Sequence, residues 1–254
     1  MSKYFTSIAM LLFAAGAISQ RKPIDLQSKD TVANKQEYGL RIGVDISRPV
    51  LSFADEDYTG FEIVGDYRIN ESLWLAAELG NEERSRIENL SNIDIYDFTT
   101  SGSYLKLGAD YNTYQNWYGM SNSITLGGRY AIASFSQTLN EYRIFDSNRY
   151  FNPDGFIVGS TEAEEFSSLN ATWLELVIGL KAELFSNIYV GMSIRLGHLI
   201  TNTEEDRFPN LWIPGFNKVT DNSKWGVGYN YSISYFIPFY KRAKKKRETL
   251  ENQE

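Results

Sequence analysis

Apolar and polar residues alternate along eight stretches of this chain, and the apolar set of each stretch contains no charged residue. In the last stretch, apolar side chains from Trp225 to Ile237 fall on one face, and small or polar side chains fall on the other. A period of two residues predicts a β-strand. Strands of about ten residues with one apolar and one polar face are typical of β-barrels that cross a lipid bilayer.

The connections between the eight predicted strands alternate in length: those after the second, fourth and sixth strands are Asn70–Ser72, Asn112–Asn122 and Phe185–Asn187, although the middle one is longer than usual. The strands are Tyr38–Ser47, Gly60–Ile69, Leu73–Leu79, Ser103–Tyr111, Ser123–Ala133, Thr172–Glu183, Ile188–Leu196 and Lys224–Pro238. The longer connections are Pro49–Thr59, Asn81–Gly102, Gln137–Ala171 and Thr201–Ser223. Bacterial outer-membrane barrels have short periplasmic turns and longer outer loops, and an even strand count leaves both termini in the periplasm. We therefore predict an all-β protein, a closed antiparallel up-and-down transmembrane β-barrel of eight strands, in a Gram-negative outer membrane.

The faces opposite the apolar sets hold cations and anions in balance. An eight-stranded barrel has an interior just wide enough for its side chains to fill. Because an unpaired buried charge is costly, a balanced set favours a packed ion-pair network over a pore. The predicted network consists of Arg41, Asp45, Glu62, Asp66, Arg68, Glu78, Lys106, Asp110, Arg129, Glu175, Lys181, Glu183 and Arg195. Lys224 is also expected to face inward.

A soluble barrel of the lipocalin kind has the same strand number, with its apolar faces around an internal cavity. Periodicity alone does not decide which face is inside. Aromatic residues favour the membrane arrangement, because Tyr38, Tyr67, Tyr111 and Tyr235 fall at the predicted periplasmic strand ends. Membrane proteins concentrate tyrosine and tryptophan at this interface.

The composition of the two ends of the chain differs from that of the predicted barrel. Residues 1–19 resemble a secretory signal, with Lys3, an apolar run from Ile8 to Ile18 and a small-residue cleavage site. A polar linker at 20–36, a barrel at 37–239 and a basic tail at 240–254 follow. The absence of cysteine excludes disulfides, thiolate metal sites and a lipid on an N-terminal cysteine. The net charge of −7 argues against nucleic-acid binding.

The chain resembles small bacterial outer-membrane β-barrels. The signal peptide, the eight amphipathic strands and the final strand around Tyr229, Tyr231 and Tyr235 carry this resemblance. Its architecture is similar to the transmembrane domain of outer-membrane protein A and to adhesion-type barrels. The start of the mature chain at Gln20 resembles exported proteins of the Bacteroidetes type, which include barrel families of unknown function. The resemblance implies recognition by the barrel assembly machinery, although the 15 residues after Phe239 depart from barrels that stop at an aromatic residue.

Few residues suggest chemistry. His198 is the single histidine and faces outward, where a lipid-acylating enzyme would place its base, but Ile200 rather than serine follows it on that face. Three acidic clusters, at Asp55–Asp57, Glu162–Glu165 and Glu204–Asp206, match no calcium-binding loop. We predict no catalytic residue, no cofactor and no metal site.

The predicted outer loops contain much aromatic surface. The loop candidates for contact are Tyr150, Phe151, Phe156, Phe208 and Trp212. Such residues either bind a partner or fold over one another. We predict a non-enzymatic structural or binding protein that contacts membrane lipids and an envelope protein or surface glycan. A narrow channel, a lipid-modifying enzyme and a soluble carrier are the alternatives. The basic run after Phe239 is expected to anchor the chain at the inner rim.

Overall fold

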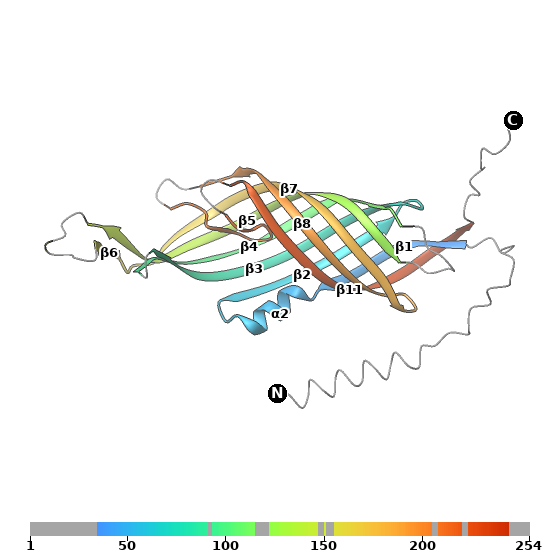
Figure 1. Ribbon diagram of the computed structural model, residues 1–254, viewed down its shortest axis with the longest axis horizontal. Coiled ribbons are helices and arrows are strands. Elements are labelled where there is room, and N and C mark those ends of the chain that lie inside the picture. The colour runs from blue at the N-terminus through green and yellow to red at the C-terminus, as the bar shows by residue number, and fades with distance from the viewer. Residues whose placement is uncertain are drawn as a thin grey trace, which may run out of the picture. The chain divides into compact units, whose positions relative to one another are not determined.

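The structure is a computed structural model, and it describes residues 35–90, 93–114, 122–146, 150, 155–204, 208–219 and 223–243. Residues Gln36–Arg242 form one compact unit, which is almost entirely β-structure (Figure 1). The second unit, Met1–Lys35 with Ala243–Glu254, lies almost wholly outside the described residues. The predicted signal peptide, most of the predicted linker and most of the basic tail therefore lie outside them too.

The described chain contains one helix and a series of strands of unequal length. In order they are β1 (Lys35–Asp45), α2 (Ser47–Ala54), β2 (Tyr58–Arg68), β3 (Leu73–Leu90), β4 (Ile93–Asn112), β5 (Ser123–Phe145), β6 (Phe156–Ser160), β7 (Glu164–Phe185), β8 (Ile188–Asn202), β9 (Trp212–Ile213), β10 (Asn217–Lys218) and β11 (Trp225–Ala243). No helix among these residues is long and apolar enough to cross a membrane.

Eight of these strands form a closed antiparallel ring. Their order is β4-β3-β2-β1-β11-β8-β7-β5, and β5 pairs back to β4. The seam between β1 and β11 carries a backbone hydrogen bond of 2.7 Å from the Ile46 amide to the Tyr231 carbonyl. β6 pairs only with β5, outside the ring. The predicted all-β, antiparallel architecture with eight main strands is therefore confirmed.

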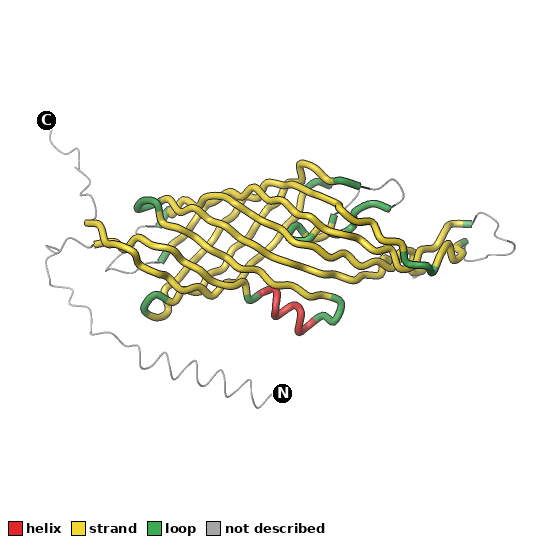
Figure 2. Tube along the Cα trace, turned by 180° about the vertical axis from the view of Figure 1, so that it is seen from behind, coloured by secondary structure: helices red, strands yellow, loops and turns green. Residues whose placement is uncertain are grey.

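Several strands are longer than the sequence pattern suggests (Figure 2). β3 and β4 stay paired as far as Leu90 and Ile93, with one register shift between Glu88 and Asn89, through most of the loop predicted at Asn81–Gly102. The loop predicted at Gln137–Ala171 is occupied largely by β5, β6 and β7. Beyond the apolar rows the outward face of these strands becomes polar, and in β3 the inward face becomes polar as well, so the period of two fades while backbone pairing continues. β11 likewise runs to Ala243, past the predicted barrel end at Phe239.

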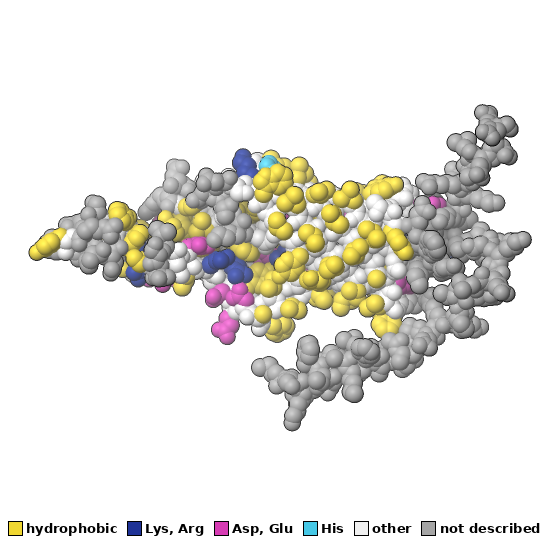
Figure 3. All heavy atoms as spheres, viewed as in Figure 1, with side chains coloured by type: hydrophobic (Ala, Val, Ile, Leu, Met, Phe, Trp, Pro, Cys, Tyr) yellow, Lys and Arg dark blue, Asp and Glu magenta, His cyan; other side chains and the backbone are white. Residues whose placement is uncertain are grey.

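Side chains on the ring alternate between buried and exposed positions. In β5, the residues from Ser123 to Phe135 are alternately buried and exposed. The exposed set is apolar and is spread over the strands in Figure 3, whereas charged atoms gather toward the ends of the longer strands. Arg129, Glu175 and Arg195 are buried inside the ring. The interior is thus the charged side over its middle section, opposite to the arrangement expected of a lipocalin-like carrier.

Three aromatic clusters divide the interior along the strands. Trp74, Tyr189 and Phe236 pack together near the short turns. The second cluster surrounds Trp173 and Phe216 and includes inward residues of β4, β5, β7 and β8. The third surrounds Phe98 and Phe208, farther out along β4 and β5. Charged residues fill the section between the first and second clusters.

Candidate functional site

The centre of the ring is occupied by a buried ion network, in which Arg129 pairs with two carboxylates. Its two terminal nitrogens donate to the two oxygens of Asp110 at 2.7 and 2.9 Å, and its Nε donates to Glu78 at 3.2 Å. Such a two-pronged pair is geometrically specific to arginine. β3, β4 and β5 place these three residues at inward positions of neighbouring strands.

Arg195 and Lys106 extend the network across the ring. Arg195 on β8 pairs with Glu78 on β3 and lies 3.5 Å from Glu175 on β7. The Lys106 ammonium on β4 donates to Glu175 at 2.8 Å. Because β8 and β3 lie on opposite sides of the ring, the Arg195–Glu78 pair links its walls directly, whereas the Lys106–Glu175 pair spans β5, the one strand between β4 and β7. Glu175 also accepts a 2.7 Å hydrogen bond from the Trp173 indole.

A second group of charges lies nearer the short turns. Asp66 pairs with Arg41 at 3.2 Å and with Lys181. The Arg41 guanidinium lies 4.4 Å from the centre of the Trp74 ring and 4.5 Å from that of Tyr189. A cation held between aromatic faces keeps favourable electrostatic contacts after losing its water. The first aromatic cluster and this ion group therefore stabilise one another.

Two residues predicted in the interior ion network, Arg68 and Glu183, bond to backbone groups near the short turns. Arg68 donates hydrogen bonds to the backbone carbonyls of Glu37, Asn70 and Glu71. Its guanidinium lies over the rings of Tyr38 and Trp74. Glu183 accepts a hydrogen bond from the Asn187 amide at the β7–β8 turn. Lys224 is exposed at the outer end of β11, so the expectation that it faces inward is wrong. These residues lie at strand ends, where the inward row meets a turn or loop.

The sequence reading missed two central residues, Arg48 and Glu82. The guanidinium of Arg48, in α2, lies 2.6 Å from Glu82, 3.5 Å from Asp45 and 4.0 Å from Glu62. It also donates to the Tyr58 hydroxyl at 3.3 Å. Glu82 continues the inward row Glu78–Gly80 and was detectable by extending that strand. Arg48 lies in a predicted loop and had no such signal.

The connection after β8 folds into the ring rather than away from it. Its hairpin β9–β10 carries Ile213 and Phe216, which are buried against Tyr104 and Trp173. Phe216 fits because Gly197 and Gly226 lack side chains; a Cβ on either would lie 2.9 Å from its ring. Gly215 has a positive φ of 78°, and a Cβ there would lie 2.6 Å from the Tyr104 ring. We call residues 208–218 the plug.

The plug is bound to the ion network at Gly215. Its amide donates to Glu82 at 3.0 Å, and its carbonyl accepts from Lys106 at 3.0 Å. Tyr104 lies at the same junction, because its hydroxyl donates to Glu62 at 2.5 Å while its ring faces Gly215. Both backbone polar groups of the turn are therefore satisfied by buried side chains.

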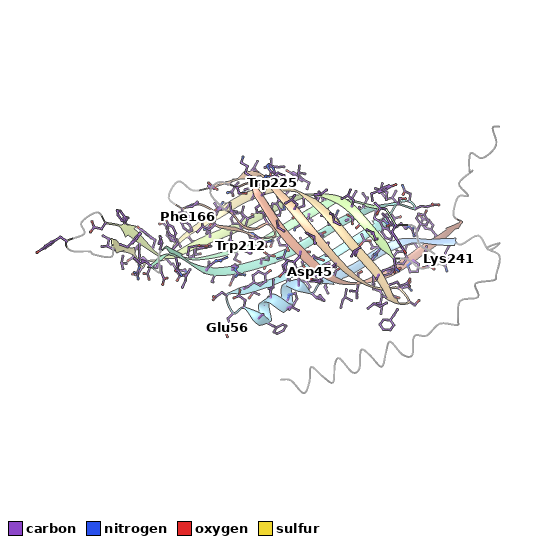
Figure 4. All side chains as sticks on the ribbon, in the orientation of Figure 1. Asp45, Glu56, Phe166, Trp212, Trp225 and Lys241 are labelled. Atoms are coloured by element: carbon purple, nitrogen blue, oxygen red, sulfur yellow. The ribbon has the colours of Figure 1, made fainter. Side chains whose placement is uncertain are left out.

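The aromatic loop residues separate into two groups. Phe208 and Trp212 are 2 % and 8 % exposed, so the plug uses them internally and the expectation that they contact a partner is wrong for both. They fold over inward residues of β2, β4 and β5, which was the alternative for these loops. Figure 4 labels Trp212 within the ring and Trp225 on its outer side. Tyr150 is exposed, and Phe156 packs edge-on against Phe145. Phe151 lies outside the described residues.

A small cavity lies beside the plug, lined by described residues. Arg48, Lys106, Arg195, Phe216 and Tyr229 are among its lining residues. Its volume is about 10 Å³, which is about the space of one water molecule. The described residues therefore fill the ring at this level.

Candidate chemistry outside the interior is limited to isolated groups. His198 packs edge-on against Trp225, with ring centres 4.6 Å apart, and its partner on β7 is Leu174. Asp55 forms an ion pair with Arg84 at 2.9 Å. No group of three or more His, Asp or Glu side chains in the described part of the chain is arranged to hold a metal ion.

Comparison with known proteins identifies the family. Residues 1–242 match the model of a family described as a domain of unknown function (DUF6048). The chain belongs to the DUF6048 family. No curated protein compared with this DUF6048 chain matches it in sequence.

Two solved structures are distantly similar to this member of the DUF6048 family. Ail, the attachment invasion locus protein of Yersinia pestis, is 10% identical, with a TM-score of 0.37 over 79% of this chain and 97% of Ail. CarO of Acinetobacter baumannii is 11% identical, with a TM-score of 0.34 over 80% of this chain and 98% of CarO. Likeness of this size does not establish a shared function.

Proposed function

We propose that this DUF6048 protein is a plugged, eight-stranded transmembrane β-barrel of the Gram-negative outer membrane, with no enzymatic activity. In this role it is a structural or binding component whose outer surface contacts an envelope protein or a surface glycan. The observation that carries the proposal is the division of the ring's two faces. Outward residues such as Leu107, Leu176 and Ile194 are apolar and about half exposed, whereas the charged residues are buried inside. Such a surface is stable in hydrocarbon and costly in water.

Aromatic residues at the short-turn end support a membrane boundary there. Tyr111, Tyr235 and Phe239 are exposed on the outer face of β4 and β11. Tyr38, which was expected among them, is instead buried, stacked on Tyr240 with ring centres 5.3 Å apart. A belt of exposed aromatic rings is the usual marker of the lipid–water interface. β1 begins and β11 ends at this same side, which is the periplasmic side in the proposed orientation.

The filled interior supports a binding or structural role rather than conduction. The Arg195–Glu78 pair joins opposite walls, the Lys106–Glu175 pair spans β5, and the plug fills the section beyond them. The cavity beside the plug is about the size of one water molecule. We therefore expect no steady single-channel current from the purified protein in planar bilayers.

The hairpin of β5 and β6 is the proposed contact surface. It carries exposed Ile144, Phe145 and Val158, and Tyr150 follows β5 with 87% of its surface exposed. β6 has a strand partner on one side only. An exposed apolar hairpin with a free strand edge is a common docking element.

Two matched substitutions on β7 test the membrane assignment. Leu176→Arg places a charge in the middle of an outward row, and Asn170→Arg places it on the same face beyond that row. In a bilayer, Leu176→Arg should cost about 2–4 kcal/mol and lower the folded yield in lipid vesicles. Asn170→Arg should fold as the wild type does, and heat-modifiable gel migration measures both. If Leu176→Arg folds as well as Asn170→Arg, the outward rows do not face lipid.

A substitution in the hairpin tests the contact role. Phe145→Ser with Val158→Ser removes apolar surface without touching the ring. We expect the variant to fold normally and to lose photo-crosslinks that a reactive residue at position 150 forms in intact cells. Equal crosslinking in variant and wild type would contradict a role for this hairpin.

A further inference from the structure

The ring has a break in its wall between β2 and β11. β1 ends at Asp45, opposite Glu62 of β2. β2 nevertheless continues outward to Tyr58, paired with β3, and β11 begins at Trp225, paired with β8. No residue of β1 lies between these two stretches. The chain instead turns into α2, which lies beside β2 in Figures 1 and 2.

Side chains at this break take over the hydrogen bonds that a longer β1 would make. The Asp45 carboxylate accepts from the Tyr231 amide of β11 at 3.2 Å and from the Ser47 amide of α2 at 2.8 Å. On the other side, the Ser52 hydroxyl of α2 accepts from the Gly60 amide of β2 at 2.9 Å. Figure 4 labels Asp45 at this point. The broken strand edges are therefore capped by α2 and by Asp45, the last residue of β1.

Arg48 fixes the inner side of α2. It is 8% exposed, although it lies on a helix outside the inner rows, and it reaches Glu62 and Glu82 through the break. It also lines the small cavity together with Gly226, Gly228 and Tyr229 of β11. Arg48 is the single charged residue of α2, so the one charge of the helix lies on its inner side.

The outer side of α2 is apolar and strongly exposed. Phe53 is 93% exposed and Val50 is 62% exposed. Val44 of β1 and Phe61 of β2, on the strands that precede and follow α2 in the chain, are also apolar and exposed, and they belong to the rows assigned above to the lipid surface. Acidic residues begin only after the helix, at Asp55–Asp57. In Figure 4, Glu56 lies beyond the helix end.

We propose that α2 is a lipid-facing closure of the ring: Val50 and Phe53 contact bilayer acyl chains, while Arg48 latches the helix over the break. This inference rests on the proposed function, because it requires the outward rows to lie in lipid. A helix satisfies its own backbone groups and can therefore replace missing strand in hydrocarbon, whereas an open loop cannot. An apolar helix face ending at acidic residues fits a position between acyl chains and headgroups.

Lipid contact can be measured at single positions, because the chain has no native cysteine. Phe53→Cys carries an environment-sensitive fluorophore in phosphatidylcholine vesicles, and quenching by brominated acyl chains is compared with quenching by aqueous iodide. Leu107→Cys on β4 is the control for lipid, and Glu56→Cys is the control for water. We expect brominated lipid to quench the label at position 53 as strongly as at position 107, and iodide to quench it much less than at position 56.

The other outcomes of this experiment distinguish a failure of the α2 inference from a failure of the membrane assignment. If position 107 responds to brominated lipid and position 53 responds to iodide, α2 faces water and the inference fails alone. If neither quencher reaches position 53, a protein surface covers α2, and the inference also fails. If position 107 itself responds only to iodide, the proposed function fails.

The latch is tested in the same labelled protein. Arg48→Gln shortens and neutralises the side chain, so the Asp45, Glu62 and Glu82 carboxylates lose their shared partner. We expect the ring to keep its heat-modifiable migration while the label at position 53 becomes more accessible to iodide. Arg48→Lys, which keeps the charge, should recover part of the wild-type quenching. Unchanged quenching in Arg48→Gln would show that other contacts hold α2.

Discussion

Two neighbouring sections of the ring interior are filled in different ways. The middle section is filled by side chains of the wall strands, which pair as ions across the ring. The outer section is filled by the plug, which brings aromatic and aliphatic residues from a loop. Buried ions require matched partners and fixed geometry, whereas apolar packing requires volume. The same ring is therefore filled by charged side chains of its own strands in the middle section. In the outer section, where the inward strand residues are apolar, it is filled by apolar side chains of a loop.

The largest expected effect comes from breaking the ion-paired section. Arg129→Met keeps much of the side-chain volume but removes the arginine that pairs with Asp110 and Glu78, so Glu78 keeps only its pair with Arg195. Removing one member of a buried pair typically costs about 3–5 kcal/mol. Urea unfolding in detergent micelles measures the loss. Arg143→Met, on an ion pair that is more than one-third exposed, is the control and should have little effect. A similar loss in both variants would contradict a special role for the interior network.

The next effect comes from the plug. Phe216→Ala removes a ring that packs against Trp173, with ring centres 5.6 Å apart, and that lies close to Gly197 and Gly226. We expect a loss of about 3 kcal/mol in the free energy of unfolding, the low end for such a change. The double variant with Arg129→Met should lose close to the sum if the two sections are independent. A loss far from the sum would show that they act as one unit.

Tyr104 allows that coupling to be measured more directly. Tyr104→Phe keeps the ring that faces Gly215 and removes the hydroxyl that donates to Glu62. Leaving that carboxylate with one donor fewer should cost about 1–3 kcal/mol. Combining Tyr104→Phe with Phe216→Ala in a double-mutant cycle gives the interaction energy across the boundary. An interaction energy of zero would place Tyr104 wholly in the ion-paired section.

The smallest effect is expected outside both sections. Lys241 pairs with Glu37 at 2.7 Å, but the lysine side chain is 60% exposed. Exposed pairs contribute about 0–1 kcal/mol, and salt screens them. Lys241→Ala should therefore unfold within error of the wild type. A loss comparable to that of Tyr104→Phe would mean that this strand end contributes more than its exposure suggests.

The difference between the two sections also explains what the sequence could predict. Within strands, the position of Glu78 or Arg129 follows from the period of two, so most inward charges were assigned from the pattern. The pattern stops where both faces become polar, which is why the strand residues around Glu82–Arg86 were read as a loop. The plug has no period at all. Its one signal was the density of apolar residues between Phe208 and Phe216, and density alone does not say whether a loop folds inward.

Arg48 shows a further limit of such reading. Its partners Asp45, Glu62 and Glu82 lie on three different strands, so its role depends on tertiary geometry. A helix of eight residues with one charge is too short for hydrophobic periodicity to predict it. The acidic excess of the inward rows at this level, once Glu82 is included, is the physical reason that a cation from elsewhere is needed.

The seam between Ile46 and Tyr231 has a consequence for biogenesis. It joins the first wall strand to the last, so the cylinder cannot be completed until the final stretch of polypeptide is available. Contacts between such distant parts of a chain form slowly. Until then β1 and β8 each present an unpaired edge, which is prone to aggregation. A truncated product ending before Trp225 should therefore be a substrate for chaperones and proteases rather than a smaller folded protein.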